Sequence, residues 1–371
     1  MRRTILALLL AAAAFPLAAD EAIGKIVDLE GPVEIVRDEE TLDAKKVKAG
    51  FALENFDLLV TGADGQVELQ ITSPKSPPTT VKVAPRTRFS LEIGKAGSKQ
   101  QTTVGLMIGS VTMKCAQLGG SQSVKVQTDT AVMGVRGTAF TVTAAASGDL
   151  LVDCDEGEVE CTDEDGNTER VVPGEVIEKL FEQRFQRLPV AISSLAQFRR
   201  NWNTDRISAL KANALKAITG FARRYTILLI RFSADFARLQ AVQRTIDRWR
   251  AEDRAGRIGT RTEAMSQLKE LGPVLKDVRQ TLFLLQPVYL RLLELREYHD
   301  AGFGRGIIRY DDRTSETTTQ FFLRLEQDRR DLERKMARVR LVARLFALRN
   351  EGRIPWGGFG GEADTDSFFG N

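Results

Sequence analysis

The change in hydrophobic period near residue 190 constrains this chain more than any other sequence feature. Before it, short runs alternate apolar and polar residues, as strands with one buried face do. After it, apolar residues recur every three or four positions, as on one face of a helix. Pro189 marks the change, and Ser193 or Ser194 is suited to cap a helix that begins at Leu195. We therefore expect an all-β N-terminal domain followed by an all-α domain.

The two halves also carry opposite net charge. Residues 20–189 hold 28 Asp+Glu against 18 Lys+Arg, whereas residues 190–371 hold 33 Lys+Arg against 22 Asp+Glu. The basic half contains 28 Arg and 5 Lys, and arginine both lays an apolar stem along a helix and forks onto carboxylates. This split indicates two domains, and it leaves open whether they dock on each other.

Turn-forming residues separate the strands of the first half, among them Gly31-Pro32 and Asp64-Gly65. Many short strands at this spacing favour a sandwich, a barrel or a short β-solenoid. The alternating runs that predict strands include Val33–Val36, Val67–Ile71, Val81–Val83, Phe89–Ile93, Val124–Val126 and Leu150–Val152.

Three long helices are expected in the second half, joined by glycine-rich links at 255–259 and 301–306. The first is predicted from Leu195 to about Arg254, with Gly220 as a weak point. The other two space their apolar residues alternately by three and four, which is the seam of a coiled coil. Gly272-Pro273 and Pro287 predict a break or kink in the second helix. The simplest arrangement is an elongated antiparallel three-helix bundle.

The stretch Thr128–Val142 organises the β half. Its β-branched residues favour two short strands, and Gly134 and Gly137 bracket Arg136 between them. Glycine inside a strand pattern marks a bulge, a corner or a close backbone approach. We expect a strand, a corner that needs glycine, and a second strand carrying Phe140. Arg136 is expected mainly to tie this corner together, with contact to a partner as the less favoured role.

The run Gly134–Val142 resembles the signature of the FecR-type periplasmic domain family. Further landmarks of that family follow in the expected order between about residues 24 and 180, including Gly24–Val33, Asp57–Leu69 and Pro173-Gly174-Glu175. The resemblance implies a twisted, solenoid-like β domain that binds a protein or ligand. It identifies as the family motif, with a structural or partner-contact role, Gly134, Arg136, Gly137, Thr138 and Phe140.

Met1 to Ala19 has the charged start, short apolar run and small-residue end of a secretory signal. We divide the chain into a signal peptide (1–19), a FecR-like β domain (20–188), a helical bundle (189–353) and a disordered Gly-rich tail (354–371). No later stretch is apolar enough to predict a membrane span. A periplasmic or secreted location is expected.

Three cysteines fall in the β half. An oxidising compartment permits a disulfide, and the turn between Cys154 and Cys161 could bring these two together across a hairpin. Buried free thiols are an equally weighted alternative for both of them and for Cys115.

Catalysis is not expected, because the single histidine, His299, has no motif around it, and nucleophile elbows, HExxH and phosphate-binding loops are absent. We predict no catalytic residue, no cofactor and no metal site. Basic clusters such as Arg329-Arg330 and Arg334 to Arg340 interleave with acidic residues, so they favour a salt-bridged helix face over nucleic-acid binding.

These observations predict a non-enzymatic envelope protein in which the β domain binds and the helical half supports assembly with envelope proteins or with copies of itself. An alternative is a FecR-like signalling component of the type that relays a receptor's state to a sigma factor. Binding of an envelope glycan is a further alternative, although the β half lacks Trp and Tyr.

Overall fold

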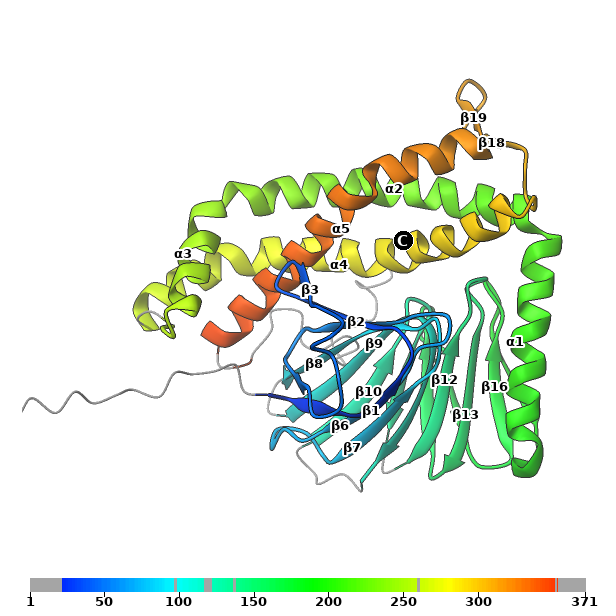
Figure 1. The fold of residues 1–371 in the computed structure, drawn as a ribbon, viewed down its shortest axis with the longest axis horizontal. Helices are drawn as coiled ribbons and strands as arrows, with labels where there is room; N and C mark the ends of the chain where they lie inside the picture. The colour runs from blue at the N-terminus through cyan, green and yellow to red at the C-terminus, as the bar shows by residue number, and fades with distance from the viewer. Residues whose placement is uncertain are drawn as a thin grey trace, which may run out of the picture.

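The computed structural model describes residues 22–96, 99–116, 122–135, 138–258, 261–350 and 352. Strands β1 to β17 come first in the chain and five helices follow and pack together beside them (Figure 1). The prediction of a β half followed by a helical half is therefore confirmed. The predicted signal peptide (1–19) and the predicted tail (354–371) lie outside the described residues.

The strands of the β half form two sheets that share the long strand β9 (Lys99–Cys115). One sheet contains β1 (Gly24–Glu30), β4 (Ala52–Leu53), β6 (Gln66–Ile71), β7 (Thr79–Val83), β12 (Ala139–Ala144), β13 (Leu150–Glu156), β16 (Glu175–Lys179) and β17 (Phe185–Pro189). The other contains β2 (Val33–Arg37), β3 (Glu40–Thr41), β5 (Leu58–Thr61), β8 (Arg88–Ala96), β10 (Gln122–Gln127), β11 (Ala131–Val135), β14 (Val159–Asp163) and β15 (Thr168–Val171). Apolar side chains of both sheets, such as Phe89 and Phe140, form one core.

β9 passes from one sheet to the other at Gly109. Residues up to Ile108 pair with β8, and residues from Gly109 onward pair with β12. Gly109 has φ +99°, and a Cβ there would lie 2.5 Å from Thr87 Cα, so this corner requires glycine. The alternating pattern did not predict β9, because the strand is interrupted by glycines and begins with a polar run.

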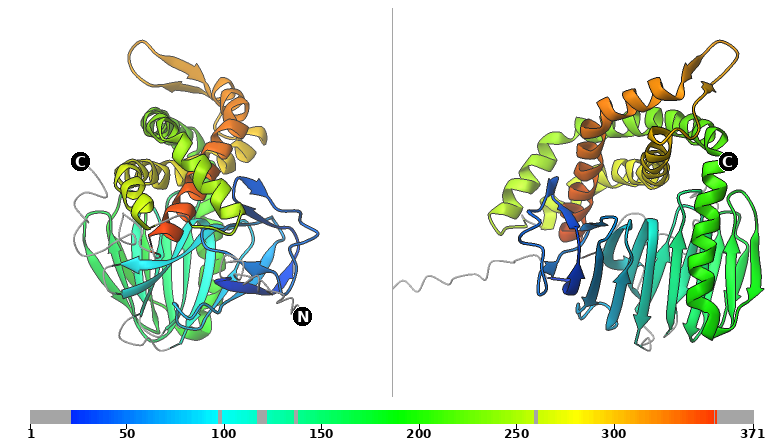
Figure 2. Two further views of the ribbon diagram at one scale, coloured as in Figure 1. Left: turned by 90° about the vertical axis from the view of Figure 1, so that its left-hand side faces the viewer. Right: turned by 45° about the vertical axis from the view of Figure 1, so that its right-hand side comes forward.

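The helices are α1 (Leu195–Ala212), α2 (Ala214–Ala241), α3 (Gln243–Arg254), α4 (Arg261–Asp300) and α5 (Thr318–Arg349). α2 and α4 run antiparallel and α5 crosses back obliquely, all three lying over the β half, while α1 stands alongside its strands (Figures 1 and 2). The antiparallel bundle is thus one part of a five-helix arrangement.

The prediction of one helix from Leu195 to Arg254 is wrong. The chain turns at Asn213 and at Val242, whereas Gly220 lies inside α2. The first turn separates two packing environments, because Trp202 of α1 is buried against the β half while α2 packs on α4. Helical periodicity alone does not report such a change of packing partner.

The break predicted in the second helix is also absent, because α4 continues through Pro273 and Pro287. Proline removes one backbone hydrogen bond. Buried neighbours on both sides, such as Leu271, Leu275 and Val288, hold the flanking turns in place. A short hairpin, β18 (Ile307–Arg309) and β19 (Ser315–Thr317), was not predicted; it joins α4 to α5 and projects from the helices (Figure 2).

The corner at Gly109 predicts that Gly109→Ala is strongly destabilising. A left-handed backbone at a non-glycine residue costs about 1 kcal/mol, and overpacking adds about 1–3 kcal/mol. Gly166→Ala is the matched control, since Gly166 has φ +81° but open space around it, and should lose only about 1 kcal/mol. Urea unfolding measures both, and equal losses would contradict the proposed corner.

Candidate functional site

The stretch Thr128–Val142 joins the two sheets. β11 belongs to one sheet and β12 to the other, so the chain crosses between them after Val135. Arg136 and Gly137 lie outside the described residues. Gly134 lies within β11, and a Cβ there would meet nothing closer than 3.9 Å. The backbone therefore does not require glycine at position 134, and the expected corner at Arg136 and Gly137 stays a prediction. Thr138 and Phe140 are buried, Phe140 in the core.

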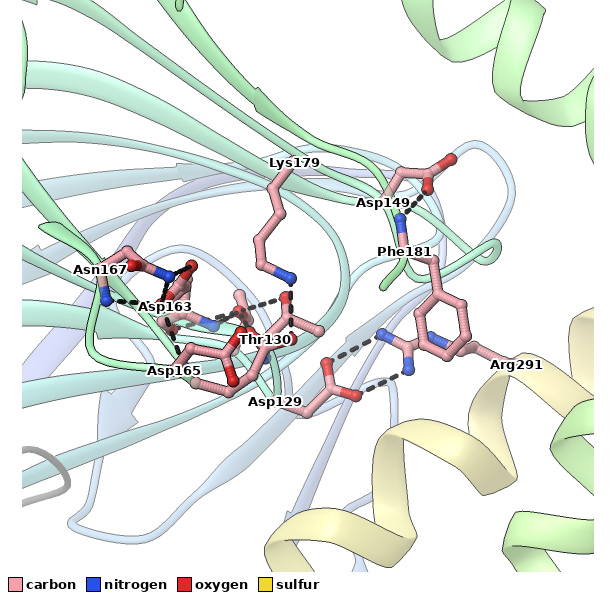
Figure 3. A network of polar contacts seen from close by, with 12 residues as sticks. Asp129, Thr130, Asp149, Asp163, Asp165, Asn167, Lys179, Phe181 and Arg291 are labelled. Atoms are coloured by element: carbon pink, nitrogen blue, oxygen red, sulfur yellow. Dashed lines mark hydrogen bonds and ion pairs between the residues drawn. The ribbon is translucent and has the colours of Figure 1, made fainter. Parts of the chain in front are cut away.

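The turn before β11 presents Asp129 to the helices. The hydroxyl oxygen of Thr128 accepts hydrogen bonds from the backbone N–H of Thr130 (3.3 Å) and Ala131 (3.0 Å), which fixes the turn. The carboxylate of Asp129 then receives two hydrogen bonds from Arg291 of α4, at 2.7 and 2.8 Å (Figure 3). Both side chains are only 1% exposed. This planar, bidentate pair is the most deeply buried ion pair between the two halves.

Arg291 is fixed on its other side by aromatic packing. Its guanidinium lies 5.6 Å from the ring centroid of Phe221 in α2, within range of a cation–π interaction. Phe221 also packs against Phe181, with ring centroids 5.6 Å apart. The backbone N–H of Phe181 donates to Asp149 at 2.7 Å (Figure 3). Polar and aromatic contacts therefore join the β half to two helices around one arginine.

Other ion pairs join the halves in the same sense, with an acidic strand or loop facing a basic helix. Arg279 donates to Glu92 at 2.6 Å, and both side chains are 8% exposed. Pairs of this kind among the described residues include Arg291–Asp129, Arg279–Glu92, Arg344–Asp38, Arg338–Glu39, Arg250–Glu39, Arg199–Asp153 and Arg206–Asp149. The two halves, which carry opposite net charges, therefore dock on each other through ion pairs.

A layer of buried polar side chains lies beneath α4. Glu92 and Lys125 are buried close together, and burial lowers the pKa of Lys125 to about 7 although Glu92 opposes the shift. The amide of Gln127 is buried without a hydrogen-bond partner and borders a cavity of about 50 Å³. Buried polar groups of this kind are commonly satisfied by internal water.

A larger cleft opens between β2, β5 and β8 on one side and α4 and α5 on the other. It consists of two adjoining hollows of about 490 and 350 Å³ that share Glu34, Val60, Arg88, Leu290 and Arg329. Arg86 crosses one end to reach Glu297 at 3.0 Å. The cleft therefore exists only because the halves are docked.

Two partly buried arginines, Arg88 and Arg340, line this cleft without an ion-pair partner among the described residues. Burial lowers the pKa of Arg88, although Glu333 opposes the shift. Burial, with repulsion from Arg279, lowers the pKa of Arg340 to about 10, and its Nη1 is buried and unpaired. The neighbouring Arg329 is paired with Glu333 at 3.2 Å. The prediction that these arginines form salt bridges along the helix is thus confirmed for Arg329, but it is wrong for Arg340.

The sequence signal for this site was the charge split, not the glycine-rich motif. Asp129 lies inside the stretch Thr128–Val142, but its pairing with an arginine 162 residues away depends on the tertiary fold. Nothing in the sequence around Arg88 indicated a functional role, because Arg88 is the first residue of an ordinary strand.

The three cysteines are buried free thiols in the structure, so the Cys154–Cys161 disulfide is not formed in it. The hairpin assumed for that pairing is absent, because β13 pairs with β12 and β16 while β14 pairs with β11 and β15.

The interface predicts that Asp129→Asn lowers the free energy of unfolding by about 3–5 kcal/mol, because it leaves a buried arginine without its counter-charge. Glu160→Gln is the matched control, since Glu160 pairs with Arg170 on the exposed surface, and should cost less than about 1 kcal/mol. Urea denaturation compares them. Equal, small losses would show that the buried pair does not hold the halves together.

The thiols are predicted to be unreactive in the native protein. Burial raises the pKa of Cys115 and of Cys154 to about 11, so almost no thiolate is present at pH 8, and thiolate is the reactive form. A disulfide-exchange reagent should label none of the three before unfolding and all three after it. If only one cysteine is labelled after unfolding, the other two are joined in a disulfide.

Residues 57–160 match the family model described as FecR protein. The fold is also similar to two crystal structures from Parabacteroides distasonis ATCC 8503, each described as a "putative anti-sigma factor". The first is 17% identical, with a TM-score of 0.32 over 38% of this chain and 63% of the other. The second is 18% identical, with a TM-score of 0.31 over 37% and 61%. The chain thus spans less than two thirds of either structure, and no curated protein matches it.

Among the residues that the structure describes, no helix has the length and apolar character to cross a bilayer. The matched segment runs from the buried Asp57, through Arg88 and Asp129, to β14. It therefore includes the acid that docks the helices and the β5 and β8 parts of one wall of the cleft, whereas β2 lies before it. The β half of this chain contains a FecR domain.

Proposed function

We propose that this chain is an exported, non-catalytic FecR-domain protein that binds another protein as a component of signal transduction. The observation that carries this proposal is the shared cleft, in which the β half, with its FecR match at 57–160, supplies one wall and the helical half supplies the other. A protein segment bound there would contact both halves at once. Binding would therefore change how firmly the halves are docked, which is a physical route for passing on a signal.

Export is supported by the first nineteen residues, which have the composition of a secretory signal. We place the mature protein in the periplasm or outside the cell on this basis. The FecR match supports a binding role over catalysis.

A second candidate is assembly through the helices, either with envelope proteins or with a second copy of the chain. Ile227 and Ile230 lie on α2, three residues apart, and both are 69% exposed. Large apolar side chains exposed side by side are typical of a surface that another helix covers. Serine at both positions should leave the fold intact and abolish any dimer seen in sedimentation.

The test of protein binding is site-specific photo-cross-linking in living cells with the complete chain. A photo-cross-linking amino acid that replaces Arg330, on the rim of the cleft, should capture one specific protein. The same residue at Lys114, on an exposed part of β9, is the control and should not. Capture of the same proteins at both positions, or of none at either, would contradict the proposal.

A further inference from the structure

The charge on the cleft is uneven. Around the larger hollow, five arginines face three glutamates, whereas around the smaller one three arginines face three glutamates. In the larger hollow Arg88, Arg330 and Arg340 have no ion-pair partner among the residues with described positions, while Glu34 is the unpaired acid. One end of the cleft therefore carries an uncompensated positive charge.

We infer that the larger hollow binds an acidic segment of a partner protein, with carboxylates on Arg88 and Arg340. This inference rests on the proposed function, since it assigns chemistry to the protein that the cleft binds. Arg88 is half-buried, on β8, and faces Glu333 and Tyr289 across the cleft without bonding to either. A guanidinium removed from water without an acceptor is unfavourable until an anion reaches it. A carboxylate there would receive a charge-assisted, two-pronged hydrogen bond.

The walls between the arginines favour a peptide over other anions. Val36, Leu58 and Val60 line the β side, and Leu290 and Met336 line the helical side. This apolar floor can receive the aliphatic or aromatic side chains that alternate with acidic ones along an extended segment. An acidic glycan would gain little from it, because carbohydrate stacks on aromatic faces and Tyr289 is the single aromatic residue of this lining.

The rim adds long-range attraction. Arg330 and Arg334 lie on the exposed side of α5 and both border the larger hollow. Exposed charges of one sign raise the rate at which an oppositely charged partner arrives, and salt weakens the effect. Binding should therefore weaken as ionic strength rises.

The test uses the complete mature chain and an unbiased library of short displayed peptides. Selection should enrich peptides that combine Asp or Glu with apolar residues. Fluorescence anisotropy then measures the affinity of an enriched peptide and of its Asn and Gln counterpart, which should bind about tenfold more weakly or worse. Hyaluronate, an acidic glycan, and inorganic phosphate are tested as competitors and should not displace the peptide.

Arg88→Gln should weaken the enriched peptide by about tenfold or more. Arg330→Gln, at an exposed rim position that cannot affect folding strongly, should weaken it less and reduce the salt dependence. Arg231→Gln is the charge-matched control, because Arg231 is exposed on α2 outside the cleft, and should change nothing. Circular dichroism checks that each variant is folded.

Enrichment of neutral or basic peptides would overturn the inference, as would equal effects of Arg88→Gln and Arg231→Gln. Displacement by hyaluronate or phosphate alone would assign the cleft to a glycan or a small anion instead. The proposed function fails separately. If acidic peptides bind in vitro but cross-linking at Arg330 captures no protein in cells, the site stands and the protein-binding function does not.

Discussion

The buried pair between Asp129 and Arg291 is the interaction on which the arrangement of the two halves depends. Two fully buried charges are stable only when each is paired and hydrogen-bonded, and here the carboxylate is aimed by a threonine turn while the guanidinium rests on Phe221. If the helices moved away, both charges would be exposed to water or left unpaired in the interface. The cleft and its unpaired arginines follow from this docking.

The classes of the two halves could be predicted from sequence because they depend on local periodicity. Strand and helix patterns repeat every few residues, so each run reports its own conformation. The errors fall where a distant contact decides the local structure. Asn213 ends a helix because α1 packs on strands and α2 on α4, and Pro273 remains inside a helix because its neighbours are buried. Gly109 was missed because its corner is defined by partners in two sheets.

The candidate site shows the same limit more strongly. The excess of acidic residues in one half and of arginine in the other is visible in the sequence. It indicated two domains, but it did not determine whether they dock on each other. Which carboxylate meets which arginine could not be predicted, because Asp129 and Arg291 are joined only by the tertiary fold. That Arg88 has no ion-pair partner is even harder to predict from sequence. It depends on whether each neighbouring carboxylate is already paired with another basic residue. A motif search favours Gly134, which lies within β11, and Phe140, which lies in the core of the β half.

The central claim is that the FecR domain and the helical half form one cooperative unit, and the chain carries natural probes for it. All three tryptophans lie after residue 190 and all three cysteines before it. One urea titration of the Trp202→Phe variant, which lacks the tryptophan that packs on the β half, can follow the helical half by tryptophan fluorescence and the β half by cysteine labelling. If the halves unfold cooperatively, both probes should give a single shared midpoint. Two separate midpoints would show that the halves unfold independently, and that the buried ion pairs do not bind them into one body.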